Sequence, residues 1–87
     1  MHASGKPASS DAIHGRLQDV FRAELDDEEL VIGPDTSQNN LKAWDSLAHI
    51  RLISGIENEF EIEFNLAEIE QFTSVRQLVQ AIEERSR

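Results

Sequence analysis

Ser46 is the residue of this chain whose type and setting best suit chemistry. It follows Trp44 and Asp45, where a polar stretch gives way to apolar residues at helical spacing. Asp45 suits the N-cap of that helix, because its carboxylate can accept hydrogen bonds from amides of the first turn. Ser46 then lies in the first turn, where free amides and the helix dipole favour a phosphate on its hydroxyl. By itself this signal is weak, because Asp-Ser at a helix start usually marks only capping.

Other kinds of chemistry fit the sequence less well. Ser46 and His49 are spaced like a nucleophile and its base, but there is no Gly-x-Ser-x-Gly motif and no evident acid to orient His49. We expect His49 to be exposed, either touched by partners or simply a polar surface group. The stretch that starts at Asp35 fails as a calcium loop, because its sixth position is Asn40 and its twelfth is Ser46. With no cysteine and three scattered histidines, neither a metal site nor catalysis by the chain itself is predicted.

The composition describes one small, acidic domain. The chain has 87 residues and a formal net charge of −9, which disfavours binding to nucleic acids and to anionic membranes. Partners with basic surfaces are expected instead. No apolar run approaches membrane-spanning length and no signal peptide is evident, so no membrane insertion and a cytoplasmic location are expected.

The first half of the chain predicts one helix and a long connection. Residues 1–10 are small and polar, and we expect a disordered tail followed by a single domain over residues 11–87. A helix is expected from about Asp11 to Leu25, because its apolar residues recur at three- and four-residue spacing. The connection from Asp26 to Trp44 is long for a compact domain, so buried apolar residues should pin it. The candidates for this role are Leu30, Ile32, Leu41 and Trp44.

A second helix is expected from Ser46 to about Phe60. Its apolar face is predicted to hold Leu47, Ile50, Ile53, Glu57 and Phe60, with Leu52 and Ile56 widening the stripe. On this reading, Leu47 anchors the turn at Ser46 in the core. Gly55 costs the helix roughly 1 kcal/mol relative to alanine, and it permits close approach of another helix.

The last third of the chain predicts two more helices. Residues 61–64 alternate between charged and apolar side chains, which also fits a strand, but no second strand is available to pair with it. Asn65 and Glu68 have the spacing of a capping box that opens a short helix to about Gln71. Ser74 and Gln77 repeat this spacing at the start of a final helix that ends near Arg85. The predicted fold is therefore all-α, a small four-helix bundle with three principal helices, one short helix and a long loop between the first two principal helices.

These features together resemble an acyl carrier protein, the phosphopantetheine-binding carrier domain. The resemblance covers residues 11–85 and rests on the element order and on the motifs Asp45-Ser46-Leu47, Glu57-Asn58-Glu59-Phe60 and Thr73-Ser74-Val75. It implies that Ser46 carries 4'-phosphopantetheine, which a phosphopantetheinyl transferase attaches from coenzyme A with the help of a magnesium ion. Asp45 would cap the helix and present the serine. The thiol of the arm would hold an acyl group as a thioester for enzymes of fatty-acid, lipid or polyketide-type biosynthesis.

The resemblance leaves partners and cargo open. Its implied partners are acyl-loading and acyl-transferring enzymes with basic docking surfaces, which a monomer would visit in turn. The acyl chain would tuck between helices lined by Leu47, Ile50, Ile53, Phe60, Ile62 and Ile69. The candidate docking residues are Ala48, His49, Ile50, Arg51, Ser54 and Glu57. Ile50 fits the core as well as it fits a docking surface.

The sequence departs from the family pattern just after Ser46. The better-known fatty-acid carriers tend to have acidic residues just after the modified serine, whereas this chain has Ala48, His49 and Arg51. The positive charge of Arg51 would face a basic partner unfavourably, which favours a specialised carrier over a housekeeping one. A peptidyl or aminoacyl carrier, or an unmodified acidic helical interaction module, remains an alternative. Mass measurement after incubation with coenzyme A and a transferase separates a modified carrier of either kind from the unmodified module.

Overall fold

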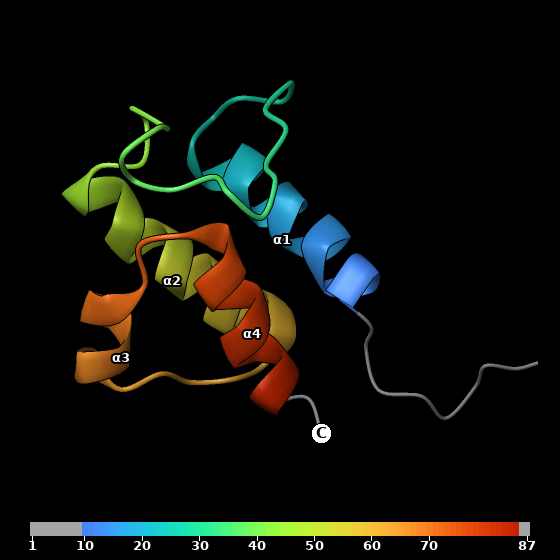
Figure 1. Ribbon diagram of the computed structural model, residues 1–87, viewed down its shortest axis with the longest axis vertical. Coiled ribbons are helices and arrows are strands. Elements are labelled where there is room, and N and C mark those ends of the chain that lie inside the picture. The colour runs from blue at the N-terminus through green and yellow to red at the C-terminus, as the bar shows by residue number, and fades with distance from the viewer. Residues whose placement is uncertain (1–9, 86–87) are drawn as a thin grey trace, which may run out of the picture.

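Four helices enclose one core in the computed structural model, which describes residues 10–85 of the chain (Figure 1). They are α1 (Ser10–Glu24), α2 (Ser46–Phe60), α3 (Leu66–Gln71) and α4 (Val75–Arg85). The predicted helices, their order and the all-α class are confirmed. Most of the predicted tail lies outside the described residues, and Ser10 already belongs to α1.

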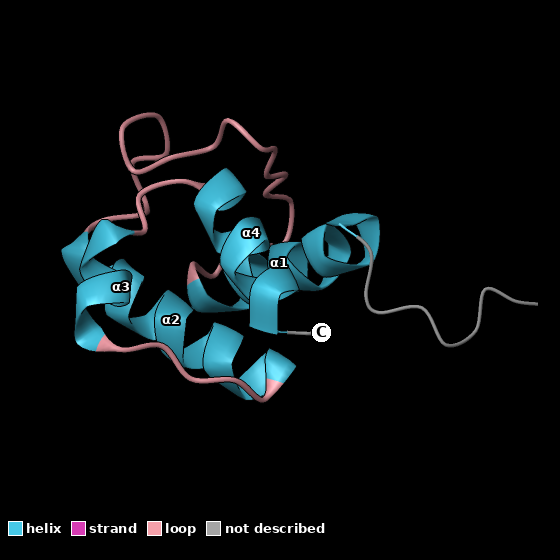
Figure 2. Ribbon diagram, turned by 60° about the horizontal axis from the view of Figure 1, so that its bottom comes forward, coloured by secondary structure: helices cyan, strands magenta, loops and turns pink. Residues whose placement is uncertain are grey.

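Loops join the helices, and among residues 10–85 no strand is present (Figure 2). Residues 61–64 connect α2 to α3 without forming a strand, and Glu61 is the C-cap of α2 in left-handed conformation, with φ 56° and ψ 49°. A single antiparallel bridge between Ser37 and Ser74 ties the long loop to the start of α4. The amide of Val75 donates to Thr36 O at 2.9 Å on the same seam. No helix within the described part of the chain is both long and apolar enough to cross a membrane.

The helix ends follow the capping residues read from the sequence. Asn65 and Glu68 form a full capping box at α3, where each side chain accepts a hydrogen bond from the other residue's amide. Ser74 and Gln77 make the same reciprocal pair at α4, with the longer bond at 3.4 Å. These side chains satisfy amides that a helix start leaves unpaired, and they fix where α3 and α4 begin.

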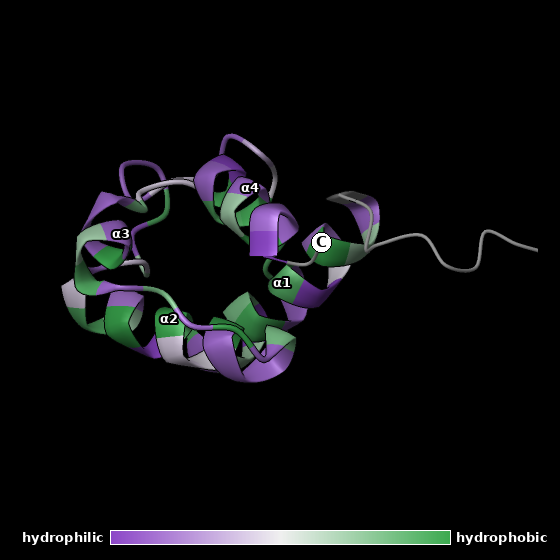
Figure 3. Cartoon of the chain, turned by 90° about the horizontal axis from the view of Figure 1, so that it is seen from below, coloured by the Kyte–Doolittle hydropathy of each residue, from purple (hydrophilic) through white to green (hydrophobic). Residues whose placement is uncertain are grey.

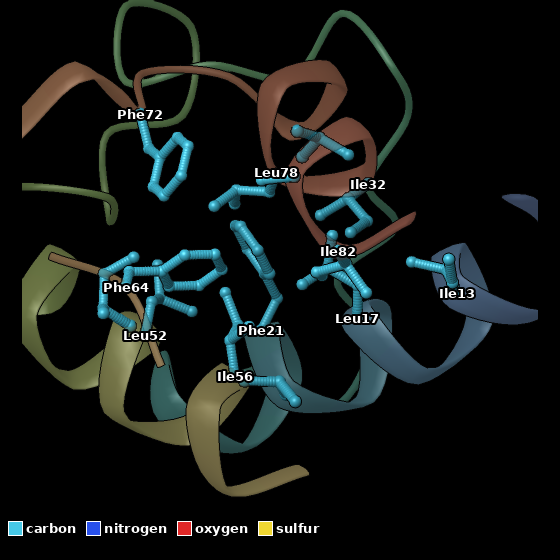
Figure 4. Packing of buried hydrophobic residues seen from close by; sticks show 14 of the residues in the cluster. Ile13, Leu17, Phe21, Ile32, Leu52, Ile56, Phe64, Phe72, Leu78 and Ile82 are labelled. Carbon is cyan, nitrogen blue, oxygen red and sulfur yellow. The ribbon is translucent and has the colours of Figure 1, made fainter. Parts of the chain in front are cut away.

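The core is built by α1, α2 and α4 together with residues from the loops (Figure 4). Aromatic side chains close one end of it, where Phe64 and Phe72 meet edge to face at 5.0 Å between ring centroids. Both α2 and α4 carry hydrophobic and hydrophilic stretches (Figure 3), as expected of amphipathic helices. The largest fully buried side chains are Trp44, Phe21, Ile13, Leu17, Leu52, Ile56, Leu78, Ile82 and Val75.

Gly55 lies where α1 and α2 pack together. A Cβ atom at this position would come within 2.9 Å of Val20 Cγ1 and 3.2 Å of Glu24 Oε2. The close helix approach predicted from this glycine is confirmed.

The long loop is pinned as predicted. Ile32 and Trp44 are buried, while Leu30 and Leu41 pack against the core from its edge. Polar side chains of α1 add to this, because Gln18 accepts from Ile32 N at 3.0 Å and Arg22 donates to Leu30 O at 2.7 Å. The loop therefore packs against the core along its length, and these contacts fix the position at which α2 begins.

The predicted apolar face of α2 is wrong by part of a turn. The buried residues of α2 are Ala48, His49, Leu52, Ile53 and Ile56, whereas Leu47 and Ile50 are 76% and 59% exposed. The physical reason is that two sets of residues have helical spacing, one with Leu47 and Ile50 and one with Ala48, His49 and Leu52, and either could face the core. The stripe that includes small Ala48 and polar His49 faces the core, because Trp44 and α3 supply partners for the imidazole.

Candidate cofactor-attachment site

Ser46 is the first residue of α2, and its side chain is exposed. Asp45 precedes it in extended conformation, with φ −93° and ψ −173°, as an N-cap requires. The Asp45 carboxylate accepts from Ala48 N at 2.9 Å, and its carbonyl accepts from His49 N at 2.8 Å. The capping residue expected from the sequence is therefore in place, and it holds Ser46 at the tip of the helix.

The backbone around Ser46 offers hydrogen-bond donors to an anion. The first amides of a helix have no intrahelical acceptor, and among the described residues no acceptor is recorded for the amides of Ser46 and Leu47. The first turn of α2 contains no acidic residue, and the carboxylate of the N-cap Asp45 precedes it. A phosphate ester on the Ser46 hydroxyl would lie at the positive end of the dipole with these amides within the same turn. The site fits a phosphodiester.

Trp44 supports the site from behind. Its side chain is 1% exposed and meets Phe21 of α1 edge to face, with 5.1 Å between ring centroids. The indole Nε1–H donates to His49 Nδ1 at 2.9 Å. His49 is itself 8% exposed and also contacts Ile69 O through Nε2 at 2.8 Å. The residue before the cap is therefore tied both to α1 and to the first turn of α2.

This geometry also bears on the pairing of Ser46 with His49 as nucleophile and base, which the sequence did not favour. Both ring nitrogens of His49 are engaged by groups inside the fold, so neither is available to take a proton from Ser46. Within the described residues there is also no cluster of histidine, aspartate or glutamate that could hold a metal ion. What remains is an exposed serine on a rigid helix end, which suits a residue that another enzyme modifies.

Comparison with known proteins decides the family. The family model for the phosphopantetheine attachment site matches residues 15–82. An acyl carrier protein of Streptomyces coelicolor is 37% identical over 65 residues, covering 71% of this chain and 68% of that protein. The chain belongs to the acyl carrier protein family. Its fold also matches the solution structure of a holo acyl carrier protein from Geobacter metallireducens, with a TM-score of 0.71, 33% identity, and 86% of this chain and 82% of that chain covered.

Family membership establishes the class of the protein. It is a carrier and not an enzyme, and its cofactor is covalently attached 4'-phosphopantetheine. Interaction with a phosphopantetheinyl transferase and with biosynthetic enzymes follows from that class.

Three residues of the carrier do not have the positions predicted for them. Leu47 is 76% exposed, so it does not anchor the site turn in the core; Trp44 takes that place. Ala48 and His49 are buried and cannot offer a docking surface. The sequence carried a signal for the buried histidine, because residues 49, 52, 53 and 56 have the i, i+3, i+4, i+7 spacing of one helix face. His49 had been predicted to be exposed because histidine is polar.

The other candidate docking residues of the carrier divide into two groups. Ile50, Arg51 and Ser54 are exposed and share one side of α2 with Leu47. Glu57 is half-buried, and its Oε2 accepts from Phe64 N at 2.9 Å, so it holds the connector to α3. Leu47 and Ile50 point outward and do not line an interior site for an acyl chain, whereas Ile53 is buried in the core.

Proposed function

We propose that Ser46 is the attachment site and that the chain carries acyl intermediates as thioesters on the thiol of the arm. The observation that carries this proposal is the exposed Ser46 hydroxyl at the capped start of α2, backed by buried Trp44. The matched segment of the family, residues 15–82, includes this serine. The enzymes served would belong to fatty-acid, lipid or polyketide-type biosynthesis.

The attachment reaction balances with coenzyme A as the donor. The Ser46 oxygen forms a bond to the phosphorus that bears pantetheine, the pyrophosphate linkage of coenzyme A breaks, and adenosine 3',5'-bisphosphate leaves. The serine proton passes to a base on the transferase, because His49 is occupied inside the fold. The carrier contributes an accessible hydroxyl, a positive helix end and a scaffold that keeps both in place.

Intact-mass measurement tests the site. The protein is incubated with coenzyme A and a broad-specificity phosphopantetheinyl transferase, next to the variants Ser46→Ala and Ser54→Ala. Wild type and Ser54→Ala should gain one phosphopantetheine, and Ser46→Ala should gain none. Ser54 is the matched control, since it is an exposed serine on the same helix. No gain in the wild type would favour an unmodified interaction module, and a gain in Ser46→Ala would place the arm elsewhere.

The exposed stripe of α2, formed by Leu47, Ile50, Arg51 and Ser54, is the surface we propose for docking. Two exposed apolar side chains one turn apart, next to the modified residue, suit a transient interface. Arg51 is in no salt bridge within residues 11–85, whereas the guanidinium groups of Arg16 and Arg85 each pair with a carboxylate. Its charge is therefore free for a partner.

The free charge of Arg51 supports a specialised carrier. The net charge of −9 would steer partners with basic surfaces toward the chain at long range. At contact, however, Arg51 repels a basic residue placed opposite the middle of α2 and favours a carboxylate there. We infer that the cognate enzymes differ from those of a general fatty-acid synthase at this point.

An elongation assay tests this specialisation. The carrier, its Arg51→Glu variant and a housekeeping carrier are loaded with malonyl groups and supplied to a general fatty-acid synthase. Wild type should be elongated less efficiently than the housekeeping carrier, and Arg51→Glu should recover part of the difference. Ser54→Glu is the control, because it adds negative charge one turn away and keeps Arg51. Elongation of the wild type at the housekeeping rate would contradict the proposal.

The remaining features follow from this role. A monomer leaves the exposed stripe of α2 open to successive enzymes, and a cytoplasmic location gives access to coenzyme A. If the group found on the arm in the native host is an amino acid or a peptide, the chain is a peptidyl or aminoacyl carrier instead of an acyl carrier.

A further inference from the structure

His49 joins three parts of the domain at one buried point. Its Nδ1 accepts from Trp44 Nε1–H at 2.9 Å, and its Nε2 lies 2.8 Å from Ile69 O. The imidazole and indole rings are nearly parallel, with 26° between their planes and 6.0 Å between centroids. The residue before the cap, the first turn of α2 and the middle of α3 therefore meet at a side chain that is 8% exposed.

The two partners fix the state of the imidazole. An indole nitrogen can only donate, so Nδ1 has to present a lone pair to Trp44. A carbonyl oxygen can only accept, so Nε2 has to carry the proton that reaches Ile69 O. The ring is consequently neutral and in the Nε2–H tautomer, because a proton on Nδ1 would remove the acceptor of the Trp44 bond.

The short helix α3 needs this contact more than the other helices do. It spans six residues, none of them buried. Toward α4 it is held by Glu68, whose Oε1 and Oε2 both accept from Arg85 Nη2, at 2.6 and 2.5 Å. Toward α2, which lies beside it in both views (Figures 1 and 2), it is held by His49 and Ile69. Breaking this contact would free the α2 side of α3.

We propose that His49, as the neutral Nε2–H tautomer, is a positioning residue that latches α3 to the Ser46 end of α2. The latch couples the two regions, since the imidazole that holds α3 also holds Trp44, two residues before Ser46. Movement of α3 away from α2 would therefore loosen the support of the modified serine. The consequence for modification rests on the function proposed above, whereas the latch itself is a property of the unmodified protein.

Nitrogen NMR of the wild-type protein tests the tautomer directly. In ¹⁵N-labelled protein at neutral pH, the long-range proton–nitrogen correlations of His49 should show a protonated Nε2 and a bare Nδ1. The indole proton of Trp44, the only tryptophan, should exchange slowly with solvent. His14 is the matched control, since its Nε2 also meets a carbonyl, Ile32 O at 2.7 Å, far from the site. A proton on Nδ1 of His49 or a rapidly exchanging Trp44 indole proton would overturn the latch.

Substitution tests the coupling to α3. His49→Leu keeps bulk and removes both bonds, whereas His49→Gln can still accept from Trp44 and donate to Ile69 O. In His49→Leu, amide hydrogen exchange within α3 should rise about 3- to 10-fold, as expected for one lost hydrogen bond. His49→Gln should restore much of the protection, and His14→Leu should leave α3 unchanged. Equal acceleration in α1 and α4 would show a general loss of stability and would overturn the specific latch.

The transferase assay then links the latch to the site. With coenzyme A and the same broad-specificity transferase, kcat/KM for His49→Leu should fall several-fold, and it should recover in His49→Gln. Unchanged kcat/KM together with faster exchange in α3 would overturn the coupling to Ser46. If wild type itself accepts no phosphopantetheine, the proposed function fails, while the NMR and exchange results still judge the latch.

Discussion

The two sides of α2 are built from similar residues and do opposite things. One side buries Leu52, Ile53 and Ile56 together with a histidine, and the other exposes Leu47 and Ile50 next to an arginine. Hydrophobicity alone does not separate the two stripes, because both have helical spacing. What separates them is the supply of partners, since only the inner stripe finds Trp44 and Ile69 for its polar member.

The outer stripe leaves favourable burial unused. Fully burying a side chain such as leucine or isoleucine contributes roughly 1.5–3 kcal/mol, and this small domain forgoes most of that at Leu47 and Ile50. Single exposed apolar residues are ordinary, but two of them one turn apart beside Ser46 fit the docking surface proposed above. The comparison shows that α2 places its stabilising contacts on the inner side and leaves the outer side to solvent.

The largest expected effect compares two isoleucines of α2, the buried Ile53 and the exposed Ile50. Ile53→Ala should destabilise the domain by about 2–5 kcal/mol, because Ile53 is 4% exposed and its loss leaves a cavity. Ile50→Ala, one turn away and 59% exposed, should change stability by about 0.5 kcal/mol or less. Urea unfolding followed by circular dichroism measures both. Similar losses in the two variants would erase the distinction between the two sides.

The next test concerns the side of α2 that faces α1. Gly55→Ala places a Cβ within 2.9 Å of Val20 Cγ1, and overpacking of this kind costs about 1–3 kcal/mol. The gain in helix propensity, roughly 1 kcal/mol, offsets part of it, so we expect a net loss of up to about 2 kcal/mol. Ser54→Ala, the exposed neighbour, should be neutral or slightly stabilising in the same unfolding experiment. A more stable Gly55→Ala variant would show that α1 gives way without cost.

The sequence was a good guide where the signal is local. Caps such as Asp45 and the Asn65–Glu68 pair satisfy amides within their own turn, so residue type and spacing predict them. The α1 stripe was also readable, because Ile13, Leu17 and Phe21 have no competing stripe of apolar residues. The fold class followed from these elements, and the attachment residue stays a prediction that Ser46→Ala will test.

The sequence was a poor guide where a residue depends on distant partners. His49 lies inside because Trp44, from the loop, and Ile69, twenty residues later, complete its hydrogen bonds. Glu57 serves the fold for the same reason, since it meets the amide of Phe64 across the end of α2. Helical periodicity fits both stripes and contains neither contact, so Leu47 was predicted in the core and His49, from its residue type, in water. The hydrogen bonds of His49 to Trp44 and Ile69 O therefore determine which side of α2 faces the core.

Loss of the N-cap of α2, Asp45, should have a smaller effect on stability. Asp45→Ala removes the acceptor for Ala48 N and should cost about 1 kcal/mol of stability. It should also slow modification of Ser46, because the first turn is then free to fray. Asp45→Asn keeps the acceptor and is the control. Thermal unfolding by circular dichroism and the transferase assay measure the two effects, and an unchanged melting temperature in Asp45→Ala would argue against the cap.

The smallest expected effect is a pH dependence on the α4 side of α3. The bond from the Asn65 amide, and then the Arg85 guanidinium, hold the pKa of Glu68 below its ordinary value of 4.5. A carboxyl whose pKa is lowered by folding stabilises the native state above its ordinary pKa, and this contribution is lost as the pH falls through the lowered value. Glu68 is 31% exposed and its partner 27%, so solvent screening keeps the effect small.

The variant Glu68→Gln isolates this contribution. Near pH 7 it should melt below wild type, and the difference should shrink as the pH falls below 4.5, the ordinary value of the carboxyl. Melting temperatures by circular dichroism between pH 7 and pH 3 measure it, with Glu70→Gln as the exposed control on the same helix. A difference that stays constant over this range would mean that Glu68 acts through its shape and amide contact alone. The α3 helix would then depend on His49 more than on charge.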